Sequence, residues 1–234
     1  MNKIILLLVA SLFLSFSYAQ ELTGKQLLAN AIQYHDPNGN WETFKGTLKV
    51  TMTIPEKPNR NSEIKIDLPN EYFYVKATRG ENTTEYTVDR GVCKITFNGV
   101  ENPSEAILKE HKLSCDRANL FKNYYTYLYG LPMKLKDNGT NIHEKVEKRT
   151  FKGKEYLVLK VTYDESVGKD TWYFYFNPKT YAMEVYQFFK EAKDSGEYIL
   201  LSDETTINGI KMPKVRAWYY NKNDGYLGTD TLVK

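Results

Sequence analysis

An arginine and a run of aromatic side chains are the residues of this sequence best suited to bind a ligand. Arg117 lies near the start of a segment from Ser114 to Tyr129 in which a serine cap precedes a helical pattern. When each residue is turned by about 100°, the apolar side chains cover an arc of roughly 200°. A helix that rests on a core commonly needs a stripe only a little over about 100° wide. The arc consists of Ala118, Leu120, Phe121, Tyr124, Tyr125, Tyr127, Leu128 and Tyr129.

The width of this arc has two interpretations, which the sequence leaves open. The helix is either ordinary core inside a curved sheet, or the cover of a cavity that accepts an apolar ligand. Arg117 is correspondingly either a surface arginine with its stem along apolar side chains or in an ion pair, or an anchor for a headgroup or carboxylate. For the cavity we predict contacts from the helix and from later strands. The predicted ligand-binding residues are Arg117, Phe121, Tyr124, Tyr125, Leu128, Trp172, Phe174 and Trp218.

Motifs for catalysis and for metal binding are absent from the sequence. It has no nucleophile elbow, zinc-protease motif, phosphate loop or dinucleotide fingerprint. The histidines His35, His111 and His143 have no neighbours at a metal-ligand spacing. His35 and Asp36 fall at a predicted helix end, where capping and contacts with the helix dipole explain them. We expect a protein with no catalytic step, metal or cofactor. A hydrolase with carboxylates distant in sequence is the minor alternative.

The two cysteines, Cys93 and Cys115, have two alternative states. A disulfide between them would persist in an exported protein. It would close a loop of roughly 22 residues and stabilise the fold by about 3 kcal/mol in the chain-entropy model. The alternative is a pair of buried free thiols. We expect the disulfide.

The first residues have the pattern of a secretory signal. A basic residue precedes an apolar run over 4–16, and a small-x-small site follows at 17–19. We expect cleavage after Ala19, so that residues 20–234 form one domain in the periplasm or outside the cell. The apolar run is shorter than the about 20 residues that a spanning helix needs. No later segment is long and apolar enough, so we expect a chain that does not span the membrane.

The charge of the chain is nearly balanced. The sequence has 32 Lys and Arg against 29 Asp and Glu, with lysine spread along its length. No basic patch of the kind that binds nucleic acid or anionic membranes is therefore evident. Aromatic residues make up 14% of the chain, which suits β-structure and apolar ligand surfaces.

The first half of the chain reads as a short helix followed by alternating strands. Residues 23–34 form the helix, since Thr23-x-x-Gln26 resembles a capping box and the turn formers in "HDPNG" end it. In the strands, apolar and polar residues alternate, which is typical of one buried and one wet face. The predicted strands lie at 46–54, 64–68, 71–78, 82–89 and 92–97.

A helical stretch at 103–129 separates these strands from a second series. On 172–176 both faces carry aromatic residues, so we expect something besides water to cover the outer face. Asn208-Gly209 is a signal for a tight hairpin. The predicted strands lie at 142–151, 154–163, 170–177, 181–190, 196–207, 210–221 and 226–233. Flat open sheets of this size are uncommon. We therefore predict a mainly β (α+β) fold, a strongly curved antiparallel sheet or unclosed barrel of about 11–12 strands.

The order of these elements resembles the LolA/LolB-like lipoprotein-carrier superfamily. Four stretches are more closely similar to a group of exported Bacteroidota proteins of unassigned function. The stretches are "YHDPNGNW" (34–41), "NYYTYLYGLPMKL" (123–135), "WYFYFNPKTYAMEVYQF" (172–188) and "NGIKMPKVRAWYYN" with "YLGTD" (208–230). The likeness covers most of residues 20–234, but no residue-level motif of the carriers is recognisable.

The resemblance implies helices on the concave side of an open barrel, with an apolar cavity between helix and sheet. Carriers of this type hold lipoprotein acyl chains there. From the export signal, the aromatic arc and this resemblance we expect an envelope protein of a Gram-negative cell that binds a lipid, an acyl chain or another amphiphile. The alternatives are a module that docks to an envelope protein without a ligand and, less favoured, an envelope hydrolase.

Overall fold

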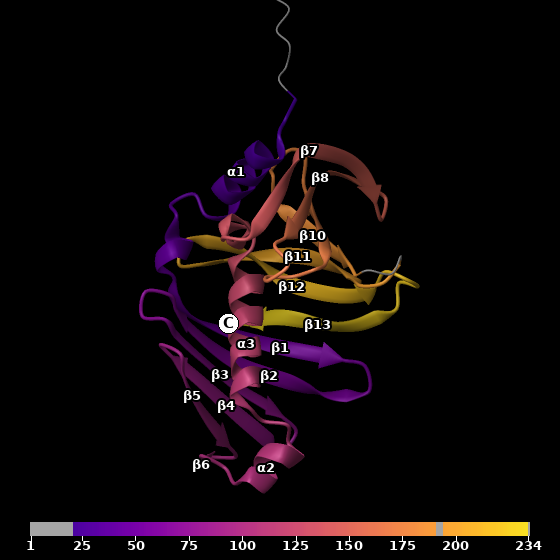
Figure 1. Cartoon of the computed structure of the whole chain (residues 1–234). Coiled ribbons are helices and arrows are strands. Elements are labelled where there is room, and N and C mark those ends of the chain that lie inside the picture. The colour runs from indigo at the N-terminus through magenta and orange to yellow at the C-terminus, as the bar shows by residue number, and fades with distance from the viewer. Residues whose placement is uncertain (1–20, 191–193, 234) are drawn as a thin grey trace, which may run out of the picture.

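One antiparallel sheet contains all the strands of the described part of this protein. The computed structural model describes residues 21–190 and 194–233. In that part of the chain, 13 strands pair in the order β6-β5-β4-β3-β2-β1-β13-β12-β11-β10-β9-β8-β7 (Figure 1). The first series is β1 (Lys45–Ile54), β2 (Lys57–Asp67), β3 (Tyr72–Arg79), β4 (Asn82–Asp89), β5 (Val92–Phe97) and β6 (Val100–Glu101). The second is β7 (Thr140–Phe151), β8 (Lys154–Tyr163), β9 (Thr171–Phe176), β10 (Met183–Phe189), β11 (Glu197–Ile207), β12 (Ile210–Tyr220) and β13 (Tyr226–Val233).

Local sequence explains most of these strands and their turns. In β1, Leu48 and Val50 are buried while Lys49 between them is exposed, as the period of two requires. Asn208 and Gly209 both have positive φ, 51° and 81°, and join β11 to β12 as a two-residue hairpin. Turns of this kind match the twist of the flanking strands, and Asn-Gly is their preferred pair.

The two series of strands meet where β1 pairs with β13. Met52 of β1 lies opposite Asp230 of β13, so the first and the last strand of the described chain form the middle of the sheet. Strands β6 and β7 are the two edges and do not pair with each other, which leaves the sheet open. The predicted fold class is therefore confirmed. The strand count exceeds the expectation because the two-residue β6 carries too little pattern to be read from the sequence.

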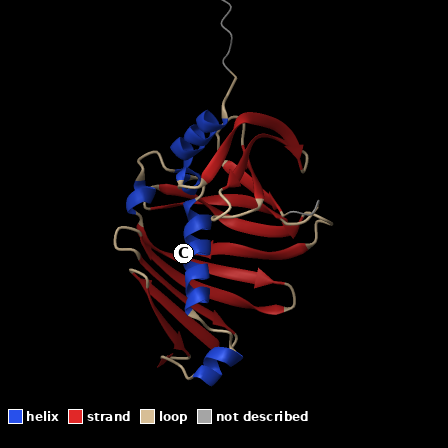
Figure 2. Cartoon of the chain, viewed as in Figure 1, coloured by secondary structure: helices blue, strands red, loops and turns tan. Residues whose placement is uncertain are grey.

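In the described part of the chain, three α-helices accompany the sheet, and one of them crosses its concave face. These are α1 (Gly24–His35), α2 (Glu105–Glu110) and α3 (Cys115–Gly130). Figure 2 shows α3 running in front of the strands, with α1 and α2 near opposite ends of the molecule. α3 packs against β3, β4 and β5, and α1 against β7, β8 and β12. The single helical stretch expected at 103–129 is thus two helices, because α2 ends at Glu110 and α3 starts only after the Ser114 cap.

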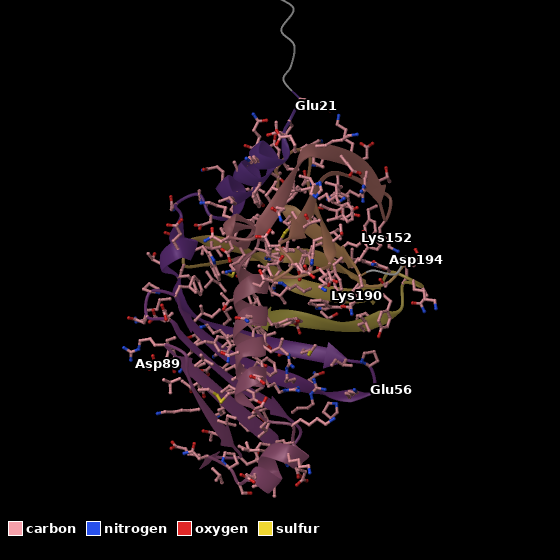
Figure 3. The ribbon with its side chains drawn as sticks, in the orientation of Figure 1. Glu21, Glu56, Asp89, Lys152, Lys190 and Asp194 are labelled. Atoms are coloured by element: carbon pink, nitrogen blue, oxygen red, sulfur yellow. A yellow bond between two sulfur atoms is a disulfide. The ribbon has the colours of Figure 1, made fainter. Side chains whose placement is uncertain are left out.

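The main core lies between α3 and the concave face. Leu48, Ile64, Val75 and Tyr86 stand directly opposite one another on β1 to β4 and are all buried. In Figure 3, side chains crowd the region where α3 crosses the strands. This packing defines how much room remains for a ligand.

A second, smaller cluster covers the convex face of the later strands. Tyr156, Val158, Tyr175 and Val185 are buried there, with Phe151 of β7 packed on them. The Arg149 guanidinium lies 4.2 Å from the centroid of the Tyr173 ring. The aromatic outer face noted in the sequence is thus covered in part by side chains of the same sheet.

The expected export signal, residues 1–19, lies outside the described residues. Among the residues that the structure does describe, no helix is long and apolar enough to cross a membrane.

Candidate functional site

α3 is the element that positions the predicted ligand-binding residues. Ser114 begins it, since its Oγ accepts a hydrogen bond from the Arg117 backbone N–H at 3.1 Å. The helix ends at Gly130, where a Cβ would collide with the ring of Trp41. The disulfide between Cys93 and Cys115 joins the first residue of α3 to β5. The helix is therefore held to the sheet at its start and packed closely at its end.

The buried stripe of α3 is narrower than the apolar arc of the sequence. Tyr125, Leu128 and Tyr129 are at most 4% exposed, whereas Leu120 is 65% exposed. Leu120 therefore does not share the buried stripe, because α3 faces the sheet along one side only at that turn. On this side the helix is ordinary core, which was one of the two interpretations of the apolar arc.

Three of the predicted ligand residues belong to this core. Tyr125, Leu128 and Phe174 are 0 to 4% exposed, and each packs in the main cluster between α3 and the sheet. We predicted that these residues would contact a ligand in a cavity. They are core instead, because the side chains of α3 and of the concave face fill the space directly beneath the helix. The accessible space lies beside α3 instead.

The other five predicted residues are partly or fully accessible. Tyr124 and Trp218 are half-buried, with ring centroids 6.2 Å apart across α3 and β12. Phe121 and Trp172 are half-buried, and Arg117 is exposed. Phe121 lines one pocket and Trp172 lines another, and the two pockets contact different residues of α3. The structure thus divides the predicted single cavity into two open sites.

The larger site is a groove of about 570 Å³, which we call the Trp172 groove. This volume is within the range of small-molecule pockets, roughly 300–1,000 Å³. The hydroxyls of Tyr127 and Tyr163 hydrogen-bond to each other, and burial raises the pKa of Tyr163 to about 12. Both phenols are therefore uncharged at neutral pH. The groove is lined by Thr126, Tyr127, Tyr163, Val167 and Trp172, with Lys122, Lys134, Asp137 and Asp170 among its polar residues.

The smaller site has a volume of about 400 Å³ and a basic lining, and we call it the arginine pocket. Arg60 and Arg79 enter it from β2 and β3, and Arg117 from α3. The Arg60 Nη2 donates a hydrogen bond to the Tyr125 hydroxyl at 3.0 Å. The apolar residues of the arginine pocket include Tyr86, Phe97 and Phe121, and His111 also lines the pocket.

A buried charged pair lies between the strands under α3. Arg216 and Asp230 stand opposite each other on β12 and β13, and each is 1% exposed. Burial raises the pKa of Asp230, while the charges of Arg60 and Arg216 oppose that shift. The Tyr124 hydroxyl donates to Asp230 Oδ2 at 3.4 Å. Oδ1 of Asp230 has no hydrogen-bond partner among the described residues.

His35 and Asp36 have structural roles. The His35 Nδ1–H donates to the carbonyl of Lys211 at 2.7 Å, and its Nε2 accepts from the Met183 N–H at 2.9 Å. A neutral ring satisfies both bonds, and burial lowers the pKa of His35. Asp36 accepts from the backbone N–H of Trp41 at 2.9 Å. His35 therefore joins α1 to β10 and β12 in addition to standing at the end of α1.

The remaining histidines are also accounted for by contacts. His111 stacks on Phe97 with ring centroids 4.2 Å apart, and His143 lies 3.4 Å from the Thr162 hydroxyl. No group of three or more His, Cys, Asp or Glu side chains in the described part of the chain could hold a metal ion.

Four charged residues of this region were missed by the sequence analysis: Arg60, Arg79, Arg216 and Asp230. Arg60 precedes Ile64 by four residues and Arg79 follows Val75 by four, so both stand in phase with buried positions. The signal in the sequence was an arginine at a strand position that alternation assigns to the buried face. Their assembly was not visible, because it depends on pairing between strands distant in the chain.

Comparison with known proteins assigns the chain to a family. A family model matches residues 2–234. The chain belongs to DUF6503, which is described as a family of unknown function. No match is found among curated proteins.

Solved structures with a similar fold have low sequence identity to this chain. A LolA superfamily protein from Nitrosomonas europaea is 10% identical with a TM-score of 0.49, and the match covers 91% of this chain and 92% of that one. A DUF1329 family protein from Desulfovibrio piger is 9% identical with a TM-score of 0.50, covering 90% of both chains. A domain described as an outer membrane lipoprotein-sorting protein, from Vibrio parahaemolyticus, is 8% identical with a TM-score of 0.47, covering 90% and 92%. A LolA superfamily protein is thus among the structures that this chain resembles, as the sequence led us to expect. The likeness describes the fold alone.

Proposed function

We propose that this protein is a binding protein of the cell envelope that holds the apolar part of a lipid or another amphiphile in the Trp172 groove, without a catalytic step. The observation that supports this proposal is the groove itself. It has a volume of about 570 Å³, lies against an aromatic helix, and is walled by Tyr127, Tyr163 and Trp172. Each methylene group buried there would contribute about 0.8 kcal/mol to binding.

The distribution of exposed apolar side chains favours a groove ligand over docking of a partner protein. Large interaction surfaces are contiguous apolar patches. The most exposed large apolar residues in the described part of the chain are instead spread over α3, four strands (β5, β6, β12 and β13) and a loop. They are Val92, Val100, Leu120, Val167, Tyr220, Tyr226 and Val233.

The test is a substitution on α3 that fills the Trp172 groove and leaves the core residues unchanged. Thr126 lines the groove, so we expect Thr126→Trp to occupy it and to weaken binding of a fluorescent fatty acid by about tenfold or more. The matched control is Asn119→Trp, because Asn119 is exposed on the same helix and lines neither site. Unfolding midpoints of both variants show whether the fold is kept.

Native mass spectrometry of the mature protein, purified gently from its own cells, identifies a ligand class. We expect an adduct of lipid mass that is lost on delipidation and is reduced in Thr126→Trp. A clean apoprotein that takes up no fluorescent fatty acid would contradict the proposal, as would uptake that Thr126→Trp and Asn119→Trp leave equally unchanged.

A further inference from the structure

The arginine pocket gathers three arginines and no acidic residue among its described lining. Arg60 and Arg79 are directly opposite each other on β2 and β3, so their side chains leave the same face of the sheet. Like charges at directly opposite positions destabilise a sheet. Burial together with the charge of Arg60 lowers the pKa of Arg79. No Asp or Glu is among the described residues that line the pocket.

Aromatic contacts orient two of the three guanidinium groups of the pocket. The Cζ atoms of Arg60 and Arg117 lie 5.6 and 5.7 Å from the centroid of the Phe121 ring. Such contacts orient a cation without consuming its N–H donors. The Nε of Arg60 is buried and has no hydrogen-bond partner among the described residues, and Arg79 donates only to the Met52 sulfur, at 3.9 Å. Guanidinium donors on β2 and β3 are therefore left without an oxygen partner among the described residues.

A neighbouring carboxylate, that of Asp230, does not remove the excess of positive charge in the arginine pocket. Across the sheet, Arg216, Asp230, Met52, Arg60 and Arg79 stand in one row of directly opposed residues. Asp230 attracts both Arg60 and Arg216 and is itself buried. One carboxylate thus serves two arginines, and the charges of Arg79 and Arg117 are left without an acidic partner in the pocket.

We propose that the arginine pocket is an anion-binding site that takes a carboxylate or phosphate group between Arg60 and Arg79, with Arg117 closing it from α3. The planar fork of arginine matches the oxygens of both groups and binds them by paired, charge-assisted hydrogen bonds. An anion placed there would turn the repulsion between Arg60 and Arg79 into two attractions. This inference goes beyond the proposed function, because it does not depend on the Trp172 groove.

The first measurement is the thermal unfolding midpoint of the mature protein in inorganic phosphate, against chloride at matched ionic strength. We expect a saturable rise for the wild type, at least a tenfold weaker response for Arg79→Gln, and an intermediate response for Arg79→Lys, which keeps the charge but loses the fork. Arg90→Gln is the matched control, since Arg90 is 76% exposed in the β4–β5 turn and pairs with Asp89. Figure 3 labels Glu56, in the β1–β2 turn, and Asp89, the last residue of β4, on opposite sides of the molecule.

The second measurement separates two sources of the anion. Dodecanoate and dodecanol share a chain, so a preference for dodecanoate that is lost in Arg79→Gln would assign the site to an amphiphile headgroup. Equal binding of the two, with a phosphate response that depends on Arg79, would assign it to a free anion. Either result supports the site, and the phosphate arm stands even if no amphiphile binds.

A structural role for Arg79 is distinguished by stability without a ligand. Because Arg79→Gln removes the repulsion with Arg60, we expect its unfolding midpoint in chloride to equal or exceed that of the wild type. The proposal is overturned if neither phosphate nor dodecanoate acts through Arg79. It is also overturned if Arg90→Gln changes both responses as much as Arg79→Gln does.

Discussion

Arg216 connects the end of α3 to the middle of the sheet. Its Nη1 donates to the carbonyl of Pro213 at 3.0 Å and its Nη2 to the carbonyl of Leu128 at 3.2 Å. Leu128 lies in the last turn of α3, where carbonyl groups have no partner within the helix. The guanidinium carbon also lies 4.1 Å over the ring of Tyr129. A single buried side chain thus caps a helix and faces Asp230.

Replacing Arg216 by methionine should destabilise the fold strongly. The variant removes one of the two positive charges that act on the buried Asp230, and removing one partner of a buried charge typically costs about 3–5 kcal/mol of unfolding free energy. The double variant Arg216→Met/Asp230→Asn should lose less, because the buried carboxylate is removed together with that charge. Urea unfolding of both variants and of Asp230→Asn measures the coupling. A double variant less stable than Arg216→Met would contradict the assigned pairing.

His35 should make stability depend on pH below neutrality. Its folded-state pKa is lowered by burial, so the native ring stays neutral while the unfolded chain binds a proton below a pH of about 6.5. The free energy of unfolding should therefore fall as the pH drops from 7.5 to 5, by at most about 1.4 kcal/mol per pH unit from this residue. Chemical unfolding at both pH values measures the slope. His35→Gln should lower stability at pH 7.5 yet flatten the slope, and parallel slopes would contradict this account.

At the scale of elements, α3 depends on a close approach at its last residue. Gly130 packs on the ring of Trp41, which is 6% exposed and stacks on Phe44 with centroids 5.2 Å apart. This contact joins two of the stretches quoted in the sequence analysis, 34–41 and 123–135. Both stretches therefore serve the seating of α3 on the sheet.

Gly130→Ala should destabilise the protein by about 1–3 kcal/mol, because an added methyl group overpacks the contact with Trp41. Gly168→Ala is the control, since a Cβ at Gly168 would meet no atom within 4 Å. Unfolding midpoints of the two variants should differ clearly. Equal midpoints would show that Trp41 can move aside at little cost.

Element by element, the sequence predicted what is local. The Ser114 cap, the capping box at Thr23 and the Asn208-Gly209 hairpin are all found, because each depends on residues within four positions of one another. The orientation of α3 was harder to predict. An arc of aromatic residues does not say which of its members face a sheet, so Tyr125 and Leu128 were assigned to a cavity although they are core.

At the scale of the whole molecule, the pairing of β1 with β13 makes one sheet out of two series of strands. Thr51 lies opposite Thr231, and Val50 opposite Leu232, which is 4% exposed. Hydrogen bonds in such a central position are protected by neighbours on both sides. The edge strands β6 and β7 lack a neighbour on one side.

Hydrogen exchange should therefore be slowest at β1 and β13 and faster at β5 and β6. We expect amides of residues 48–52 and 229–232 to exchange together, with the highest opening free energy of the protein. Exchange followed by mass spectrometry measures both segments at once. Rapid exchange at β1 and β13, with slow exchange within each series, would indicate two independent units instead of one domain.

The sequence by itself determined the strands, the capped helices and the open antiparallel architecture, because a period of two and local turn chemistry act between near neighbours. Only the tertiary structure decided which charges meet. Arg60, Arg79, Arg216 and Asp230 come from four strands, and their row exists only once β1 has paired with β13. Register between distant strands is set by the packing of the whole core, which no local pattern encodes. For the same reason the space for a ligand lies beside α3, in the Trp172 groove and the arginine pocket.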